Sequence, residues 1–314
     1  MDALVSPTTR VSAAQLAELM RRGLLFDGAM GTMLGAVANK DWETPEELNV
    51  RDPGRVREVH RAYIRAGADA IMTNSFGGNR VRLRRAGLSE HAEEYNRRAA
   101  EIAREEAGDG VLVAGDMGPT GEFLEPLGEH THDEIVGVFA EQALALAAGG
   151  ADFLIVETMS DLSEIRAAIE GAKTSGLPVV ATMTFDVNGH TMMGVAPGVA
   201  AKKLLEFGAD AIGANCGTGP DEMTPVLRQI REAAPGAVVL GQANAGIPKI
   251  VGGRVIYDCT ADEMAVHARE WLAIGVNSVG SCCGSTPQFT GALRGVLDRH
   301  LNEGAGKKAN LDSP

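Results

Sequence analysis

The sequence predicts an α/β protein of a single domain, folded as a (β/α)8 TIM barrel. Eight short apolar runs rich in β-forming residues alternate with helix-like segments rich in Ala, Leu, Glu and Arg. The runs are continuously apolar, which is typical of parallel strands that are buried on both faces. Eight such units in a chain of 314 residues, with no break in composition, favour a closed barrel. A doubly wound sheet is the alternative, because periodicity alone does not prove closure.

The predicted strands, in chain order, are residues 24–27, 70–73, 111–115, 152–156, 178–184, 210–213, 237–241 and 277–280. The approaches to four of them are nearly a repeat: Ala-Gly-Ala-Asp-Ala-Ile (66–71), Gly-Gly-Ala-Asp-Phe-Leu (149–154), Phe-Gly-Ala-Asp-Ala-Ile (207–212) and Ile-Gly-Val-Asn-Ser-Val (274–279). Glycine at this place is the left-handed residue that ends a helix, so the repeat marks helix-to-strand junctions.

The barrel is predicted to occupy residues 11–302. Residues 1–10 and 303–314 are polar and are predicted to form flexible tails. Inside the barrel, Thr131 and Glu134 have the spacing of a capping box, which predicts the start of a helix.

Composition excludes several classes of protein. The formal charge of −13 leaves no basic surface for phosphate backbones or anionic lipids, so neither nucleic acid nor membrane is expected as a partner. Residues 1–10 lack the apolar core of a secretory signal, which predicts a cytoplasmic protein. Four cysteines do not make a disulfide framework there and are more typical of metal binding or catalysis. A homo-oligomer is compatible with the sequence.

Three cysteines follow predicted strands directly. Cys216 lies in Gly-Ala-Asn-Cys-Gly-Thr-Gly-Pro (213–220), and Cys282 and Cys283 lie in Val-Gly-Ser-Cys-Cys-Gly-Ser-Thr-Pro (279–287). Active sites of such barrels lie where strands end, so the three thiols are expected to converge. Three protein ligands with an open fourth position are typical of catalytic Zn²⁺. A vicinal disulfide or two buried structural thiols is the alternative for Cys282 and Cys283, and Cys259 is predicted to play no part.

Several further motifs stand at predicted strand ends. They are Asp-Gly-Ala-Met-Gly-Thr (27–32), Thr-Asn-Ser-Phe (73–76), Gly-Pro-Thr-Gly (118–121), Glu-Thr-Met (157–159) and Asn-Ala-Gly-Ile-Pro (244–248). Together with the cysteine blocks, they resemble the homocysteine S-methyltransferase family over about residues 24–297. That family includes the betaine-homocysteine methyltransferases, the S-methylmethionine-dependent enzymes and the homocysteine-binding module of cobalamin-dependent methionine synthase. The resemblance implies a zinc-bearing barrel in which Cys216, Cys282 and Cys283 hold the metal.

The chemistry of a thiol substrate agrees with this resemblance. A free thiol with a pKa of about 8.5 is mostly protonated at neutral pH, and only its thiolate attacks a methyl group well. Coordination to Zn²⁺ removes the proton, so L-homocysteine is expected to bind as a thiolate at the open position. We expect little general acid–base catalysis, because the leaving group needs no proton.

The amino-acid end of homocysteine needs partners of its own. Asp27 and Glu157, at the ends of the first and fourth predicted strands, are predicted to pair with its ammonium, and the resemblance assigns them this role. Backbone N–H groups of Gly28 and residues 29–32 are predicted to receive its carboxylate. Capping of the following helix is the alternative for the two acids, and a phosphate site is the alternative for the turn. By resemblance, Asn244 fills the fourth zinc position before substrate binds; an ordinary turn residue is the alternative.

Onium methyl donors bind against aromatic faces, and four aromatic residues lie near the predicted loops. Trp42 and Phe76 are the predicted donor-binding residues, and Phe123 and Phe185 are further candidates. Packing within the loops is the alternative for all four. Residues 73–80 and 118–128 look most like the bacterial betaine-type members, which favours a betaine-like donor. Gly77 departs from the animal-type betaine enzymes, which have Tyr after this Phe.

Three alternative functions can be compared with the sequence. A separate methylcorrinoid protein is the alternative donor, since no cobalamin-binding module is expected in this chain. A non-catalytic barrel that binds homocysteine or zinc is the alternative of another class. A phosphate-binding aldolase that uses residues 213–219 as an anion loop would need a lysine at a strand end, and the sequence has none there.

Overall fold

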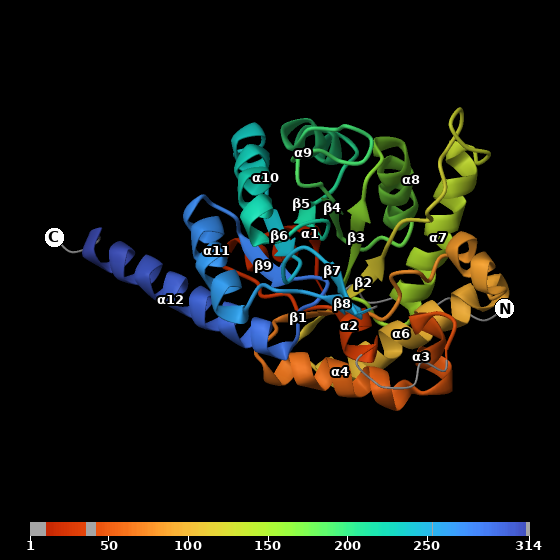
Figure 1. The fold of residues 1–314 in the computed structure, drawn as a ribbon, viewed down its shortest axis with the longest axis horizontal. Helices are drawn as coiled ribbons and strands as arrows, with labels where there is room; N and C mark the ends of the chain where they lie inside the picture. Colours follow the sequence, from red (N-terminus) through yellow and green to blue (C-terminus); the bar gives the residue numbers. More distant parts are fainter. Residues whose placement is uncertain (1–10, 36–41, 253, 312–314) are drawn as a thin grey trace.

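A computed structural model describes residues 11–35, 42–252 and 254–311 (Figure 1). The predicted tail at residues 1–10 and the last three residues of the predicted C-terminal tail lie outside the described residues. None of the described helices has the length and hydropathy needed to cross a membrane.

Seven parallel strands form one curved sheet in chain order. They are β1 (Ala70–Met72), β2 (Leu112–Met117), β3 (Phe153–Met159), β4 (Val179–Met183), β5 (Ala211–Asn215), β6 (Val239–Ala243) and β9 (Ser278–Ser281). Each overlaps one of the predicted strands. All neighbouring strands pair in parallel, and the helices surround the sheet, as Figure 1 shows. The predicted α/β barrel of one domain is confirmed.

The first predicted strand, residues 24–27, is reduced to two isolated bridges. Leu25 bridges Val279 of β9, and Phe26 bridges Ala70 of β1, both in parallel. The Phe26 N–H donates to the Val279 carbonyl at 2.9 Å, and the Asp27 N–H donates to the Ala70 carbonyl at 3.1 Å. This segment therefore lies between the two edge strands and closes the ring, but it is too short for a regular ladder.

The helices precede, connect and follow the strands. They are α1 (Ala13–Arg21), α2 (Met30–Gly35), α3 (Leu48–Arg51), α4 (Pro53–Arg65), α5 (Arg80–Leu83), α6 (Ala92–Ala107), α7 (His132–Ala148), α8 (Leu162–Lys173), α9 (Pro197–Glu206), α10 (Pro220–Ala233), α11 (Ala261–Ala273) and α12 (Pro287–Leu311). The predicted capping box is confirmed, because Thr131 and Glu134 cap α7 reciprocally. A hairpin that the sequence analysis did not predict, β7 (Lys249–Val251) and β8 (Arg254–Ile256), lies between β6 and α11.

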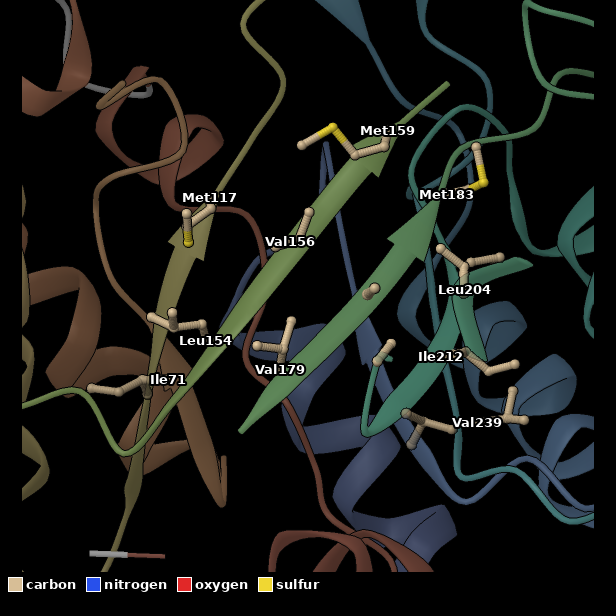
Figure 2. Packing of buried hydrophobic residues seen from close by; sticks show 14 of the residues in the cluster. Ile71, Met117, Leu154, Val156, Met159, Val179, Met183, Leu204, Ile212 and Val239 are labelled. Carbon is tan, nitrogen blue, oxygen red and sulfur yellow. The ribbon is translucent and has the colours of Figure 1, made fainter. Parts of the chain in front are cut away.

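Alternate side chains of the strands enter two separate cores. On β3, Phe153 and Ile155 point into the barrel, where the Phe153 ring meets Phe26 edge-on at 6.0 Å between centroids. Leu154 and Val156 point outward into the core between the sheet and the helices, which also holds Leu204 of α9 (Figure 2). Burial on both faces explains why the runs are apolar without alternation.

The C-terminal helix is longer than predicted. α12 continues to Leu311, so residues 303–311, which were predicted to belong to a loose tail, are helical. Extending an existing helix costs much less than starting one, which the polar composition of this segment did not reveal. Figure 1 shows the end of α12 projecting away from the barrel.

Candidate metal and substrate site

Three thiols meet at the carboxyl end of the barrel. Cys216 follows β5, and Cys282 and Cys283 follow β9. Their Sγ atoms all lie within 4.8 Å of one another, and those of Cys216 and Cys283 are 3.7 Å apart. All three are free and half-buried, and Cys259 lies outside the group. The structure thus brings the three predicted ligands together, and it contains no vicinal disulfide.

The thiols influence one another electrostatically. Hydrogen bonds from the Cys216 thiol, and then from Cys282, lower the pKa of Cys283. A cluster that stabilises a thiolate in a half-buried place is suited to a cation, because metal ligands must be deprotonated.

Cys216 has a strained backbone conformation. It has a φ of 57°, in the left-handed region that non-glycine residues rarely adopt. Its N–H donates to the Gln242 carbonyl of β6 at 2.9 Å, which fixes the turn. Thr158, directly after Glu157, has a φ of 60°. Such residues cost about 1–3 kcal/mol each and cluster at functional sites.

Asn215, the last residue of β5, connects the thiol strand to the predicted ammonium site. Its side-chain amide donates to Glu157 Oε2 at 2.9 Å. Its Oδ1 accepts from the Thr158 N–H at 2.8 Å and from Thr182 Oγ1 at 2.7 Å. The carboxyl of Glu157 is therefore held in one orientation. No sequence motif indicated a role for Asn215.

Three buried carboxyls lie near one another at this end of the barrel. They belong to Asp27, to Asp116 of β2 and to Glu157 of β3. Burial raises the pKa of Asp27 and Asp116 well above the usual range, and the neighbouring Glu157 raises both further. Burial, and then Cys216, raises the pKa of Glu157 to about 8. Acids in this arrangement favour a positively charged ligand, which would relieve their repulsion.

A cavity of about 1150 Å³ opens onto the thiols. Its wall includes the three cysteines together with Gly28, Glu157, Trp42 and Phe76, all of which the sequence analysis had selected. Asp27 and Asn244 are buried but are not part of the wall. The Asp27 Oδ1 and Asn244 Oδ1 atoms have no hydrogen-bond partner within the described part of the chain.

Two further aromatic candidates do not reach the cavity. Phe185 is only 2% exposed, and Phe123 is 45% exposed. Neither is part of the cavity wall. Loop packing accounts for Phe185, which belongs to the core between strands and helices.

The glycine-rich turn after Asp27 docks on the turn after Cys283. The Ala29 N–H donates to Ser285 Oγ at 3.2 Å, and the Gly284 N–H donates to Thr32 Oγ1 at 3.0 Å. A Cβ on Gly28 would lie 2.6 Å from Ser285 Oγ, so only glycine allows this approach. The Ala29 N–H, which was predicted to receive a carboxylate, therefore already donates a hydrogen bond to Ser285.

The β7–β8 hairpin and the residue after it supply two wall residues that no local motif indicated, Val255 and Tyr257. Tyr257 follows β8 and lines the cavity beside the thiols. A Cβ on Gly284 would lie 2.2 Å from Tyr257 Cγ, so the ring packs directly on the residue after Cys283. Arg82 of α5 also lines the cavity, with its guanidinium 4.8 Å from the centre of the Phe76 ring.

Comparisons with known proteins bear on this site. The model of the homocysteine S-methyltransferase family matches residues 24–297. Methionine synthases of Mycobacterium tuberculosis and Mycobacterium leprae are each 33% identical over 94% and 92% of this chain. The chain spans about a quarter of the length of these two relatives, 25% in each case.

Solved structures of the homocysteine methyltransferase MmuM from Escherichia coli resemble the fold. The oxidised form has a TM-score of 0.70 and 26% identity, covering 87% of this chain and 96% of that one. The metallated form has a TM-score of 0.75 at 23% identity, covering 90% and 99%. The family match agrees with the resemblance that the sequence motifs indicated. The extent of that match, over most of the barrel and all of the thiol site, shows that the chain belongs to the homocysteine S-methyltransferase family.

Proposed function

We propose that this protein transfers a methyl group from a small, betaine-like onium donor to the thiolate of L-homocysteine in a zinc-dependent reaction that yields methionine. The convergence of three thiols beside a cavity with buried carboxyls carries the proposal. A cytoplasmic location, where thiols stay reduced, is part of it.

The thiol geometry fits a zinc ion. Zinc–sulfur bonds of about 2.3 Å in a tetrahedral site place two sulfur atoms roughly 3.8 Å apart. The distance of 3.7 Å between the Sγ atoms of Cys216 and Cys283 agrees with this value. The three thiols lie in the cavity wall, which leaves a side open for a substrate. A zinc ion held by Cys216, Cys282 and Cys283 would supply a fourth position at which a thiol loses its proton.

The remaining residues bind and orient homocysteine. Glu157, fixed by Asn215, is placed to pair with the substrate ammonium, and Asp27 adds a second negative charge beside it. Asn244 is the proposed fourth ligand in the absence of substrate, which would give its unpartnered Oδ1 a partner. Fixed partners at both ends of the substrate align its sulfur, and alignment is the main source of rate in a direct displacement.

The donor is proposed to bind on the side of the cavity that holds Trp42 and Phe76. Both residues are half-buried and line the wall. Aromatic faces attract quaternary ammonium and sulfonium groups, which are the groups that release a methyl cation equivalent. The cavity volume of about 1150 Å³ is large enough for homocysteine and a small donor together.

A second candidate donor is a methylcorrinoid carried by a separate protein. The similarity to two methionine synthases motivates this candidate, because the family that the chain resembles includes the homocysteine-binding module of cobalamin-dependent methionine synthase. It differs from the first proposal in the donor alone, because the thiol site and the homocysteine site serve both.

A donor panel tests the proposal. Zinc-loaded protein is incubated with homocysteine and, separately, betaine, S-methylmethionine, S-adenosylmethionine, dimethylsulfoniopropionate or methylcobalamin, and methionine is measured. We expect methionine with an onium donor and none after the metal is removed. Full activity of metal-free protein would contradict the zinc proposal, and activity with methylcobalamin alone would favour the second candidate.

A further inference from the structure

Asp116, near the end of β2, carries a buried carboxyl that lacks a partner. Its side chain is 6% exposed, and no described residue donates a hydrogen bond to Oδ1. The backbone around it is firmly held. The Asp116 N–H donates to Thr73 Oγ1 at 2.9 Å, and its carbonyl accepts from Ser75 Oγ at 2.7 Å. The missing partner is therefore not the result of a loose strand end.

The surroundings of Asp116 are strongly acidic. Burial raises the pKa of Asp116 well above its usual range, Glu157, Asp27 and Glu46 raise it further, and Arg82 acts in the opposite direction. Four acids thus face one guanidinium at this end of the cavity. A buried carboxylate is costly unless a cation or hydrogen-bond donors compensate it, so the excess of acids favours positively charged ligands.

Homocysteine alone cannot compensate these acids. It brings one ammonium, which the proposed function assigns to Asp27 and Glu157. Glu46 has its own donor, because the Gly77 N–H points at Oε1 at 2.6 Å. Asp116 then has only a share of the Arg82 charge, which also acts on Glu46. A second cation must then come from the other ligand of the cavity.

Asp116 lies on the donor side of the cavity, next to Phe76. Both residues line the wall, at the ends of the neighbouring strands β1 and β2. The Gly118 N–H donates to the Phe76 carbonyl at 2.9 Å, and a Cβ on Gly118 would lie 2.5 Å from the Phe76 ring. A carboxylate and an aromatic ring at adjoining strand ends are the two groups that attract onium cations.

We infer that Asp116 is the residue that selects a positively charged methyl donor, by pairing with its onium centre in the cavity beside Phe76. The inference rests on the proposed function, which it deepens by assigning donor selectivity to one side chain. During transfer, the bond from the methyl carbon to the onium nitrogen or sulfur breaks while the bond to the homocysteine sulfur forms. The onium centre keeps the electron pair and loses its positive charge. The ion pair with Asp116 is therefore strongest in the bound donor and weaker in the transition state.

This difference predicts which kinetic constant changes. An interaction that weakens on the way to the transition state stabilises the bound donor more than the transition state, so its removal raises the donor KM and does not lower kcat. In Asp116→Asn the side chain keeps its shape and loses its charge, so we expect the donor KM to rise at least roughly 30-fold, the loss typical of a broken buried charge pair. We expect kcat and the homocysteine KM to stay within about threefold of the wild-type values.

Glu164→Gln is the matched control. Glu164 of α8 is also a buried carboxyl, but its Oε1 accepts from the Thr120 N–H at 2.7 Å, and it is not part of the cavity wall. Its variant should leave the donor KM unchanged. Zinc content and circular dichroism of both variants check that the fold and the metal site are retained. Kinetics are measured with betaine, S-methylmethionine and dimethylsulfoniopropionate in turn.

A binding measurement without turnover uses analogues in which carbon replaces the onium nitrogen or sulfur, so that the onium charge is absent. These are 3,3-dimethylbutanoate for betaine, 4-methylpentanoate for dimethylsulfoniopropionate and 2-amino-5-methylhexanoate for S-methylmethionine. Calorimetry with the donor that gives most methionine, and with its analogue, should show tighter binding of the cation to wild-type protein and no preference in Asp116→Asn. A wild-type level of donor KM in Asp116→Asn, or an equal rise of the homocysteine KM, would overturn the inference and leave the proposed function standing. Wild-type protein that forms methionine with none of the three cations would overturn the proposed donor class and the inference together.

Discussion

The side-chain amide of Asn215 lies 2.9 Å from the carboxylate of Glu157, so the residue that precedes the first thiol also orients the proposed ammonium partner. The two residues stand at the ends of β5 and β3, with β4 between them. Thr182 of β4 donates to the same Asn215 side chain at 2.7 Å and completes a link across three strands. The thiol site and the amino-acid site are thereby joined by hydrogen bonds within one layer of the barrel.

Replacement of Asn215 should separate these two sites. Asn215→Ala leaves the buried Glu157 carboxyl without its donor, which costs roughly 1–2 kcal/mol of substrate binding. We expect the homocysteine KM to rise about tenfold, while zinc content stays at the wild-type level. Thr182→Val is the milder control, because it removes one hydrogen bond to Asn215 and leaves Glu157 bonded. An unchanged homocysteine KM in Asn215→Ala would show that the link does not orient the substrate.

Each of the three clustered thiols should be required for the metal. Cys216→Ala, Cys282→Ala and Cys283→Ala each remove one of three ligands, and we expect each variant to lose zinc on dialysis and to form no methionine. Cys259→Ala is the matched control, since this thiol lies outside the group and should leave both properties intact. Metal content by mass spectrometry and a methionine assay give the two readouts. One equivalent of zinc retained by any of the three variants would contradict the ligand assignment.

Most of the barrel could be predicted because its signals are local. Continuous apolar runs and glycine C-caps located the seven strands of the sheet, and the motifs placed the cysteines at strand ends. Closure of the ring could not be read in the same way, because residues 24–27 contribute only two bridges. The length of α12 was also missed, since a polar segment can extend a helix that a neighbouring apolar face has started.

The site residues that escaped prediction depend on contacts between distant segments. Asn215 and Glu157 are 58 positions apart, and only the strand register shows that they touch. Tyr257 reaches Gly284 because an unpredicted hairpin turns the chain back over the cavity. Asp116 lies two residues before the motif at 118–121, and its importance comes from the hydrogen-bond partner that its Oδ1 lacks among the described residues, which no sequence pattern reveals.

The contact between Gly284 and Tyr257 can be tested by stability. Gly284 has a φ of 80°, and a Cβ there would lie 2.2 Å from the Tyr257 ring. Gly284→Ala should therefore cost the strain of a left-handed alanine, about 1 kcal/mol, and a steric penalty in addition. Gly176→Ala measures the cost of the left-handed alanine alone, because Gly176 has a φ of 76° and open space around it. Urea unfolding should show a clearly larger loss for Gly284→Ala; equal losses would mean that the ring moves aside freely.

His60 of α4 should make the stability of the fold depend on pH. The side chain is fully buried, and neither ring nitrogen has a hydrogen-bond partner among the described residues. Burial lowers the pKa of His60 to about 4; Glu106 acts against this shift and Arg57 adds to it. In the unfolded chain the pKa is about 6.5, so between these values the unfolded state binds a proton that the folded state does not. The free energy of unfolding is therefore unaffected by protonation of His60 above pH 6.5, and it decreases progressively as the pH falls toward 4.

The size of this effect follows from the shift. At pH 5 the proton bound by the unfolded chain costs the folded state about 2 kcal/mol. His60→Leu fills the same buried space without a titratable group, so it removes this pH dependence whatever it does to stability at pH 7.5. The free energy of unfolding from urea titrations at pH 7.5 and pH 5 should fall by about 2 kcal/mol more in the wild type than in His60→Leu. Parallel losses in the two proteins would show that the imidazole gains a proton as readily in the folded state as in the unfolded one.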